Sequence, residues 1–337
     1  MSEGSVPTPS VDLGAGAPAQ QLKSPRGAMV PPAEVRSYHG RPILQAPAWT
    51  WEVPVYVFVG GLGGLSEALA EAAELTGRRG LARAARRTAA AAALAGPPLL
   101  VADLGVPGRF HHMLRVFKPT SPLSVGSWIL AAFSPAAAAA AGLDEIGRLP
   151  GLRRLAQRVG SALGFGMATY TAVLFANTAV PVWHEARREL PFLFGGSAAA
   201  SAGAAALLLA PEGEQEPARR LALAGAVIEL GAEEVMERRL GSLAEPYHEG
   251  DAGRWAKLAK SCTAAGTALV AAGGANRLPL RRLGAVALLA GSFCQRWAVY
   301  RAGFQGTADP KYVVTTQRRR LAETGDASGD EQRAEHT

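Results

Sequence analysis

Long stretches without charge alternate with short charged runs along this chain of 337 residues. Residues 53–65, 88–102 and 125–143 contain no Asp, Glu, Lys or Arg, and they lack the polar stripe of a surface helix in a soluble protein. About 20 apolar residues are needed to cross the roughly 30 Å hydrocarbon core of a bilayer. The pattern predicts an all-α integral membrane protein with about eight transmembrane helices, at residues 53–71, 88–106, 125–143, 160–180, 190–210, 218–236, 258–275 and 283–300.

The two ends of the chain differ from its middle. Residues 1–36 are rich in Pro, Gly, Ser and Ala and have no basic segment followed by an apolar core, so we expect a flexible extension and no signal peptide. Residues 37–305 hold the predicted spans as one transmembrane domain. Residues 306–337 are expected to form a largely extended or disordered tail.

Arginine-rich connections suggest a topology. The first connection, residues 77–87, carries five arginines, and the third and seventh are also rich in arginine, whereas the second and fourth carry fewer positive charges. Positive residues favour the cytoplasmic side of a membrane. The odd-numbered connections are therefore expected in the cytoplasm, with both termini outside.

Charge and cysteine content exclude some functions. The net charge of +7 could indicate nucleic-acid binding, but the arginines flank apolar spans and are not interleaved with aromatic residues, so no nucleic-acid partner is expected. Cys262 and Cys294 lie inside predicted spans and are interpreted as packing residues, and without a set of four cysteines we expect no iron–sulfur cluster. A haem held by two histidines needs both inside the bundle. All six histidines fall in connections or at span edges, so no haem is expected: His39, His111, His112, His184, His248 and His336.

The connection between the second and third spans, DLGVPGRFHHMLRVFKPTSPLSVGSW at residues 103–128, is unusual. Pro107 and Gly108 break the preceding helix, and residues 109–117 predict a short amphipathic segment in the membrane interface. Its cations, imidazoles and hydroxyls suit a quinone head group, which needs hydrogen-bond donors and an acid–base chain. The alternative is an ordinary interfacial loop whose basic side chains reach toward water.

Ionisable residues inside predicted spans form a second group. Glu67 and Glu71, like Glu229 and Glu233, are four residues apart on one helical face, and Arg296 lies in the last span. Intramembrane charges are costly and often lie on proton pathways. We therefore expect a polar path through these five residues. The alternative is that Glu71 and Glu74 only mark the end of the first helix and that Glu229 and Arg296 form a structural pair.

Three stretches carry a resemblance to a known family: GRPILQAPAWTWEVPVYVFVGGLGG at residues 40–64, the segment at 103–128, and RWAVYRAGFQGTADPKYVVTTQRRRL at residues 296–321. Over most of residues 37–321 the chain resembles the NrfD/polysulphide-reductase membrane subunits, and especially actinobacterial members that accompany a formate-dehydrogenase-like enzyme. The resemblance implies two four-helix bundles in a bacterial plasma membrane. It also implies a quinone site among the first four helices, next to an outer iron–sulfur subunit. The quinone-binding positions that it implies are Trp51, Glu52, Tyr56, Asp103, Arg109, His112, Arg115, Ser127 and Trp128.

The expected function is that of a membrane anchor and quinone-reactive subunit of a multi-subunit oxidoreductase. Electrons would pass between a ferredoxin-like iron–sulfur subunit, which serves a molybdopterin catalytic subunit, and a bound quinone, which is menaquinone or another quinone. Two alternatives remain. A multi-helix transporter would explain the intramembrane charges, although its typical internal symmetry is not evident in the sequence. A purely structural anchor is the other, because Val106 and Gly108 stand where the family often has Arg and Glu.

Overall fold

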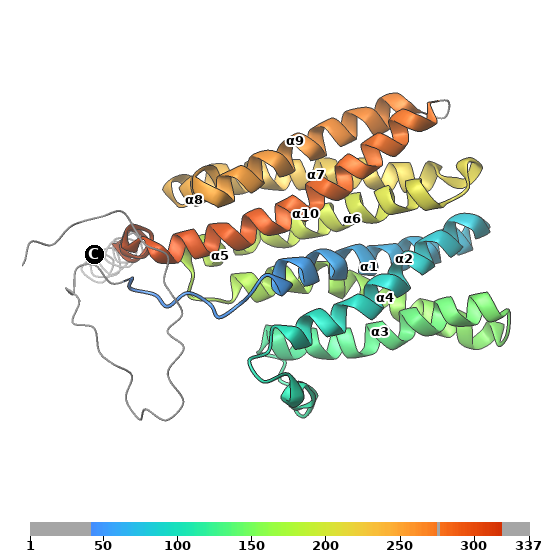
Figure 1. The fold of residues 1–337 in the computed structure, drawn as a ribbon, viewed down its shortest axis with the longest axis horizontal. Helices are drawn as coiled ribbons and strands as arrows, with labels where there is room; N and C mark the ends of the chain where they lie inside the picture. The colour runs from blue at the N-terminus through green and yellow to red at the C-terminus, as the bar shows by residue number, and fades with distance from the viewer. Residues whose placement is uncertain (1–41, 275–276, 319–337) are drawn as a thin grey trace, which may run out of the picture.

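The computed structural model describes residues 42–274 and 277–318, and within these residues it contains helices and no β-strand (Figure 1). Short 3-10 and α-helical elements join the long helices: η2 (Pro107–Leu114), α5 (Pro181–Glu185), η3 (Ala186–Arg188), η4 (Glu212–Glu214), η5 (Gly241–Ala244) and α8 (Glu245–His248). Eight helices of 20 residues or more dominate this part of the chain: α1 (Glu52–Leu75), α2 (Arg79–Ala102), α3 (Pro122–Ile146), α4 (Pro150–Ala176), α6 (Leu190–Leu209), α7 (Glu216–Leu240), α9 (Gly250–Gly273) and α10 (Leu278–Ala308).

Each predicted span overlaps one long helix, but several helices begin well before the apolar residues do. The second span was placed at residues 88–106, whereas α2 begins at Arg79 and ends at Ala102. The fourth was placed at 160–180, whereas α4 begins with Pro150 and ends at Ala176. Arginine and alanine are strong helix formers. The helices therefore continue through charged turns that an apolar pattern assigns to connections.

Four of the long helices, α1, α3, α4 and α6, are long and apolar enough to cross a membrane. A fifth crossing is possible if α2 and η2, which meet at an angle of 111°, form one broken span. Helices α7, α9 and α10 are long enough to cross a membrane but are not apolar enough. The described part of the chain is all-helical and has membrane-spanning character, while a total of eight spans stays a prediction.

The long helices form the two four-helix bundles that were predicted. In the first bundle, α1 packs against α2 and α4, and α3 packs against the same two helices. In the second, α6 and α9 each pack against α7 and α10. Helix α6 also contacts α1, α2 and α4, and α1 contacts α10, so the bundles share one interface.

The connections gather at two opposite ends of the molecule. The turns α1–α2, α3–α4, α6–α7 and α9–α10 lie at one end, on the right in Figure 1, and this is called the α1–α2 end below. The segments η2, α5 and α8 lie at the other, called the η2 end. The two ends correspond to the odd-numbered and even-numbered connections of the predicted topology.

Glycine allows the close approach of α1 and α4. A Cβ atom added to Gly64 would lie 2.3 Å from the carbonyl oxygen of Gly164, and one added to Gly164 would lie 2.3 Å from that of Gly64. Helices embedded in lipid often pack through such small residues. Within the glycine-rich run of the first span, Gly64 therefore serves contact between the two backbones.

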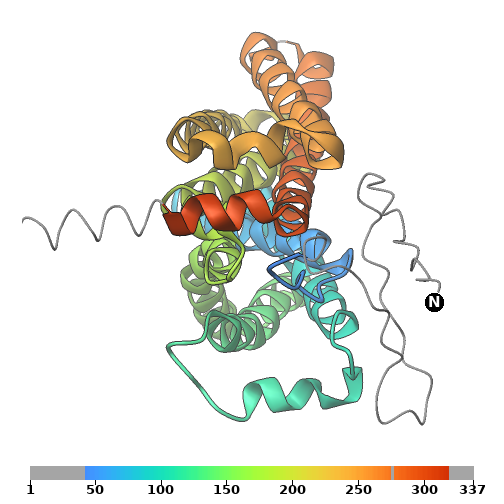
Figure 2. The ribbon, with the colours of Figure 1, turned by 90° about the vertical axis from the view of Figure 1, so that its left-hand side faces the viewer.

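The C-terminal segment differs from its prediction. Helix α10 continues to Ala308, and residues 310–318 are helical as well. Tyr312 and Val313 are buried, and the Lys311 ammonium donates to Glu245 Oε2 at 2.7 Å. The expectation of an extended or disordered tail from residue 306 is wrong for residues 306–318, where burial of Tyr312 and Val313 favours a docked helix. Helix 310–318 lies at the η2 end (Figure 2). The extension at residues 1–36 and the rest of the tail lie outside the described residues.

Candidate functional site

The approach to α1 meets the connection that follows α2. The main-chain amide of Thr50 donates to Asp103 Oδ1 at 2.9 Å, and the Thr50 hydroxyl is 2.8 Å from the same oxygen. The hydroxyl also contacts the Glu52 carboxylate. Two predicted site residues, Glu52 and Asp103, are thus brought together around a threonine that the sequence did not single out.

Aromatic residues and α10 hold this approach in place. The Tyr300 hydroxyl of α10 donates to the carbonyl oxygen of Trp49 at 2.8 Å. The Trp49 ring stacks on Trp183, with 5.4 Å between ring centroids, and meets the edge of Phe175 at 5.1 Å. Trp183 is fully buried and donates to the carbonyl oxygen of Val299 at 2.7 Å. Residues of α4, α5 and α10 therefore position together the segment that leads into α1.

Tyr56 lies one turn further into α1. It is buried, and its hydroxyl contacts that of Tyr170 on α4. The Tyr170 ring leaves no room for a Cβ atom at Gly126 on α3, since such an atom would lie 2.0 Å from Tyr170 Cε2. Tyr56 and Tyr170 thus form a hydroxyl pair among α1, α3 and α4.

The remaining predicted residues of the second-to-third connection lie apart from this pair. Segment η2 has no buried residue and projects from the bundle (Figure 2). Arg109, His112 and Arg115 are not buried, and within the described part of the chain they have no side-chain hydrogen bond or ion pair. The structure therefore does not bring these three residues to Asp103.

Three further predicted residues, Ser127 and Trp128 in α3 and Trp51 just before α1, do not contact Glu52 or Asp103 through a hydrogen bond. The Ser127 hydroxyl donates to the carbonyl oxygen of Leu123 in its own helix at 2.7 Å. The Trp128 ring meets Phe117 edge-on with 6.3 Å between centroids, and Trp51 is 58% exposed. Trp51 and Trp128 are thus exposed enough to contact a ligand, whereas the Ser127 proton is already donated.

The buried charges of the second bundle centre on Arg296. Its side chain is buried, its Nη2 donates to the carbonyl oxygen of Phe194 at 2.8 Å, and its guanidinium carbon lies 4.2 Å from the centre of the Phe194 ring. A Cβ atom at Gly61 of α1 would lie 3.5 Å from Nη2, so Arg296 occupies the interface between the bundles. Buried Glu229 on α7 interacts electrostatically with Arg296, and buried Glu233 with Lys260 of α9.

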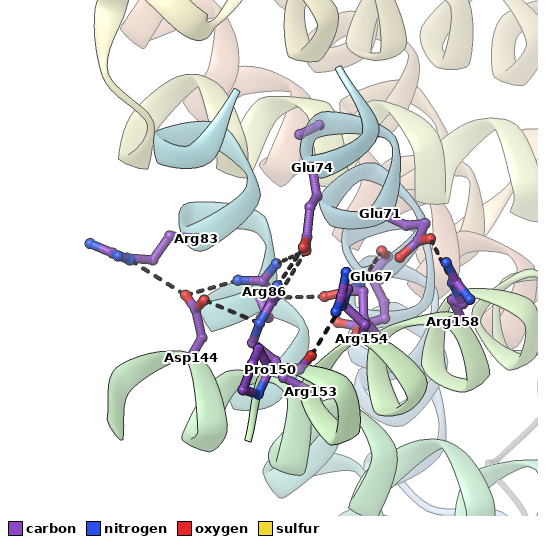
Figure 3. A network of polar contacts seen from close by, with 12 residues as sticks. Glu67, Glu71, Glu74, Arg83, Arg86, Asp144, Pro150, Arg153, Arg154 and Arg158 are labelled. Carbon is purple, nitrogen blue, oxygen red and sulfur yellow. Dashed lines mark hydrogen bonds and ion pairs between the residues drawn. The ribbon is translucent and has the colours of Figure 1, made fainter. Parts of the chain in front are cut away.

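The buried charges of the first bundle form a separate cluster at the α1–α2 end (Figure 3). Glu67 is completely buried, and neither of its carboxylate oxygens has a hydrogen-bond partner among the described residues. Gln157 Nε2 donates to the carbonyl oxygen of Glu67 at 3.1 Å, while Gln157 Oε1 accepts from Arg86 Nε at 2.6 Å. Glu71 lies 4.0 Å from Arg158. The predicted path is thus divided between two clusters, and Arg296 is associated with Glu229 alone.

A cavity of about 480 Å³ at the η2 end is lined by basic and hydroxyl side chains. It lies where α5, η3 and the end of α7 meet helix 310–318. Arg239 Nε binds Glu189 at 2.5 Å, and Arg187 lies 3.5 Å from Glu185. The basic lining residues are His184, Arg187, Arg188 and Arg239.

Sequence reasoning missed Trp49, Thr50, Tyr170 and Tyr300. Their partners are distant in sequence, so only the hydroxyl and aromatic content of residues 49–56 could have drawn attention to this region. Among residues 42–274 and 277–318, no group of three or more His, Cys, Asp or Glu side chains could hold a metal ion.

The family model described as polysulphide reductase, NrfD, matches residues 42–216, which run from the approach to α1 to the start of α7. No curated protein matches the chain. The family match covers more than half of the sequence and includes the Thr50–Asp103 contact, the tyrosine pair and the Glu67 cluster. The chain therefore belongs to the polysulphide reductase NrfD family, multi-pass membrane subunits of multi-subunit redox complexes.

Proposed function

We propose that this chain is the membrane anchor and quinone-reactive subunit of an oxidoreductase in a bacterial plasma membrane. It would exchange electrons between an iron–sulfur subunit, which serves a molybdopterin catalytic subunit, and menaquinone. Both termini would lie on the outer side of the membrane, and the arginine-rich α1–α2 end would face the cytoplasm. Family membership supports a redox complex, and the geometry at the η2 end supports the quinone site.

The contact between Thr50 and Asp103 carries the proposal. It joins the approach to α1 and the second-to-third connection, which are the two segments expected to form the site. Glu52 shares the Thr50 hydroxyl, and Trp51 between them is largely exposed. Two carboxylates beside an exposed indole give a head group an aromatic surface and nearby proton-exchanging groups.

The chemistry assigned to this position is proton-coupled electron exchange. Reduction of one quinone takes two electrons, supplied by the partner's clusters, and two protons, which bind the two carbonyl oxygens and give a quinol. Asp103 and Glu52 would supply these protons or accept them in the reverse direction. The buried hydroxyl pair of Tyr56 and Tyr170 would bound the site on its inner side.

The iron–sulfur subunit is placed at the η2 end as well. The connection at residues 184–189 presents His184, Arg187 and Arg188 beside the cavity of about 480 Å³, and helix 310–318 borders the same cavity. A surface of mixed charge suits a soluble partner, because complementary charges guide docking. This placement puts the partner at the same end as Thr50 and Asp103.

The five buried or half-buried charged residues are proposed to carry protons inward from the site. Glu67, Glu229 and Glu233 are buried, and Glu67 and Glu229 have carboxylate oxygens without a hydrogen-bond partner among the described residues, which supports this role. Their division between two clusters requires separate paths along the first and second bundles. The first would use Glu67 and Glu71, and the second Glu229, Glu233 and Arg296.

Purification of the tagged full chain from its native membranes tests the proposal. We expect an iron–sulfur subunit and a molybdenum-containing subunit to co-purify, with iron, acid-labile sulfide and molybdenum in the sample. Absence of any redox subunit would favour the transporter alternative. The same complex is then titrated with a quinone analogue, such as a hydroxyquinoline N-oxide, and binding is followed by fluorescence. A redox complex that does not bind the analogue would favour the structural anchor.

A further inference from the structure

A charged cavity of about 450 Å³ opens at the α1–α2 end, away from the proposed quinone site. It lies between the end of α1, the start of α2, the end of α3 and the start of α4 (Figure 3). Its volume is in the range of sites for small ligands. Six charged side chains line it: Glu74, Arg79, Arg83, Arg86, Asp144 and Arg153.

Two of the four arginines already have good partners. Arg86, whose side chain is only 3% exposed, lies 2.7 Å from Glu74 and 2.8 Å from Asp144. Arg153 Nη1 donates to Glu74 at 2.6 Å, and its Nε lies 3.8 Å from Asp144. Both carboxylates of the cavity are therefore engaged by these two guanidinium groups.

The other two arginines, Arg79 and Arg83, lack a close carboxylate partner. Arg83 reaches Asp144 only at 3.4 Å and its side chain is 56% exposed, and the Arg79 side chain has no hydrogen bond or ion pair within the described residues. Glu214, which also lies beside the first turn of α2, accepts a hydrogen bond from the Leu81 amide at 2.8 Å. Four guanidinium groups thus face two carboxylates, and the cavity has a surplus of two positive charges.

Large apolar side chains stand exposed on the turns that bound this cavity. Leu75 at the end of α1 is 74% exposed, and Ile146, Leu149 and Leu152 around the α3–α4 turn are 64%, 62% and 51% exposed. Leu149 also has a φ of 51°, a conformation that residues with a side chain rarely adopt. Exposed leucines beside arginines match a ligand with an anionic head and hydrocarbon chains.

We propose that this cavity binds the headgroup phosphate of an anionic phospholipid. Arg79 and Arg83 would bind the phosphate oxygens, since guanidinium groups match phosphate in geometry and charge. The exposed leucines would contact the acyl chains. Basic pockets between helices at one membrane face are suited to such lipids. This inference goes beyond the proposed redox function and does not depend on it.

Lipid retention by the purified full-length protein, with whatever subunits accompany it, tests the site. The protein is equilibrated with vesicles of phosphatidylcholine and phosphatidylglycerol, returned to detergent, and analysed by native mass spectrometry for bound lipid. The double variant Arg79→Gln/Arg83→Gln is compared with Arg148→Gln, an exposed arginine of the α3–α4 turn that does not line the cavity. Thermal unfolding of all samples controls for folding, and buried Arg86 is left unchanged.

We expect the wild type and Arg148→Gln to retain phosphatidylglycerol in preference to phosphatidylcholine. In the double variant, phosphatidylglycerol affinity should fall roughly fivefold for each arginine removed, the contribution of one cation near anionic lipid. Equal losses in the double variant and in Arg148→Gln would overturn the site. Displacement of the lipid by glycerol 3-phosphate at equal concentration would overturn the assignment to a lipid, since that anion has the phosphate without the acyl chains.

Discussion

Thr50 and Asp103 are bound through two hydrogen bonds to a single carboxylate oxygen, Oδ1, at 2.9 and 2.8 Å from the threonine amide and hydroxyl. The threonine precedes α1 and the aspartate follows α2, so this contact closes the η2 end of the α1–α2 pair. The carboxylate both fixes the approach to α1 and supplies a negative charge beside Glu52. These two roles can be separated by substitution.

Replacing Asp103 with Asn keeps an oxygen acceptor for Thr50 but removes the charge and the exchangeable proton. We expect quinone turnover by the assembled complex to fall by roughly 10²-fold, the size of a general acid–base contribution. The measurement is quinol-analogue oxidation in membranes, with kcat and KM determined separately. Asp251→Asn, an exposed aspartate at the same end, is the control. Wild-type turnover in Asp103→Asn would remove the carboxylate from the mechanism.

Arg86 should be the most sensitive charged position of the first bundle. Its buried side chain binds partners on α1, α3 and α4, so Arg86→Gln removes the more buried of the two guanidinium groups that Glu74 and Asp144 share. Breaking a buried ion pair typically costs about 3–5 kcal/mol of unfolding free energy. Arg87→Gln, next in sequence, removes only an exposed pair with Glu145 and should change little. Unfolding in mixed micelles compares the two, and equal midpoints would contradict the buried network.

The contrast between Arg86 and Arg87 also shows where the sequence was informative. Apolar runs located all eight long helices because those helices must present hydrocarbon to lipid or to one another. The same pattern placed Arg86 in a solvated connection, whereas it lies in α2 and is buried. Its burial depends on Glu74, Asp144 and Gln157, which three other helices supply. Such convergence follows from packing and is not visible in local hydropathy.

The candidate site, like the surroundings of Arg86, was only partly predictable from the sequence. Glu52 and Asp103 were recognised from their segments, but the residue that joins them, Thr50, is 53 positions from Asp103. The proline-bounded segment at residues 109–117 was expected beside them. However, α2 already ends at Ala102, and η2, which begins at Pro107, turns away from α2 by 111° and projects from the bundle. Residue type indicated the chemistry, and the tertiary fold determined which groups meet.

Gly64 should be intolerant of even one added methyl group. A Cβ atom there would lie 2.3 Å from the carbonyl oxygen of Gly164, so α1 and α4 would have to separate. Overpacking of this kind costs about 1–3 kcal/mol. In α7, Gly231 is exposed and has nothing within 4 Å of an added Cβ atom, so Gly231→Ala should instead stabilise the helix by about 0.5–1 kcal/mol. Thermal unfolding in detergent should shift in opposite directions for the two variants.

Docking of helix 310–318 should depend on pH through Glu245. The hydrogen bond from Lys311 lowers the pKa of this carboxyl below its ordinary value, so the docked state favours the ionised form. Stabilisation by this pair is therefore complete above the ordinary carboxyl pKa and is lost as pH falls through the lowered one. A spin label at exposed Gln317 should become more mobile over that range, and Glu245→Gln should give the mobile spectrum already at neutral pH. A spectrum independent of pH in the wild type would refute the coupling.

Glu229 tests whether the buried charges of the second bundle move protons or only hold the helices together. Glu229→Gln preserves the side chain's shape but leaves buried Arg296 without the carboxylate that interacts with it. If Glu229 relays protons, turnover with a quinone analogue and the accompanying proton uptake should both fall, while unfolding of the bundle changes less than turnover does. Glu234→Gln, which removes an exposed partner of Arg238 one turn away, controls for the loss of a carboxylate on the same helix. A purely structural pair predicts the reverse order, with a large loss of stability and unchanged turnover per folded molecule.

Arg296→Lys separates these cases further, because lysine keeps the positive charge but loses the planar contact with the Phe194 ring. Rescue of proton uptake by lysine would show that charge is what the path requires, and uptake lost together with folding would assign Arg296 to packing between the bundles.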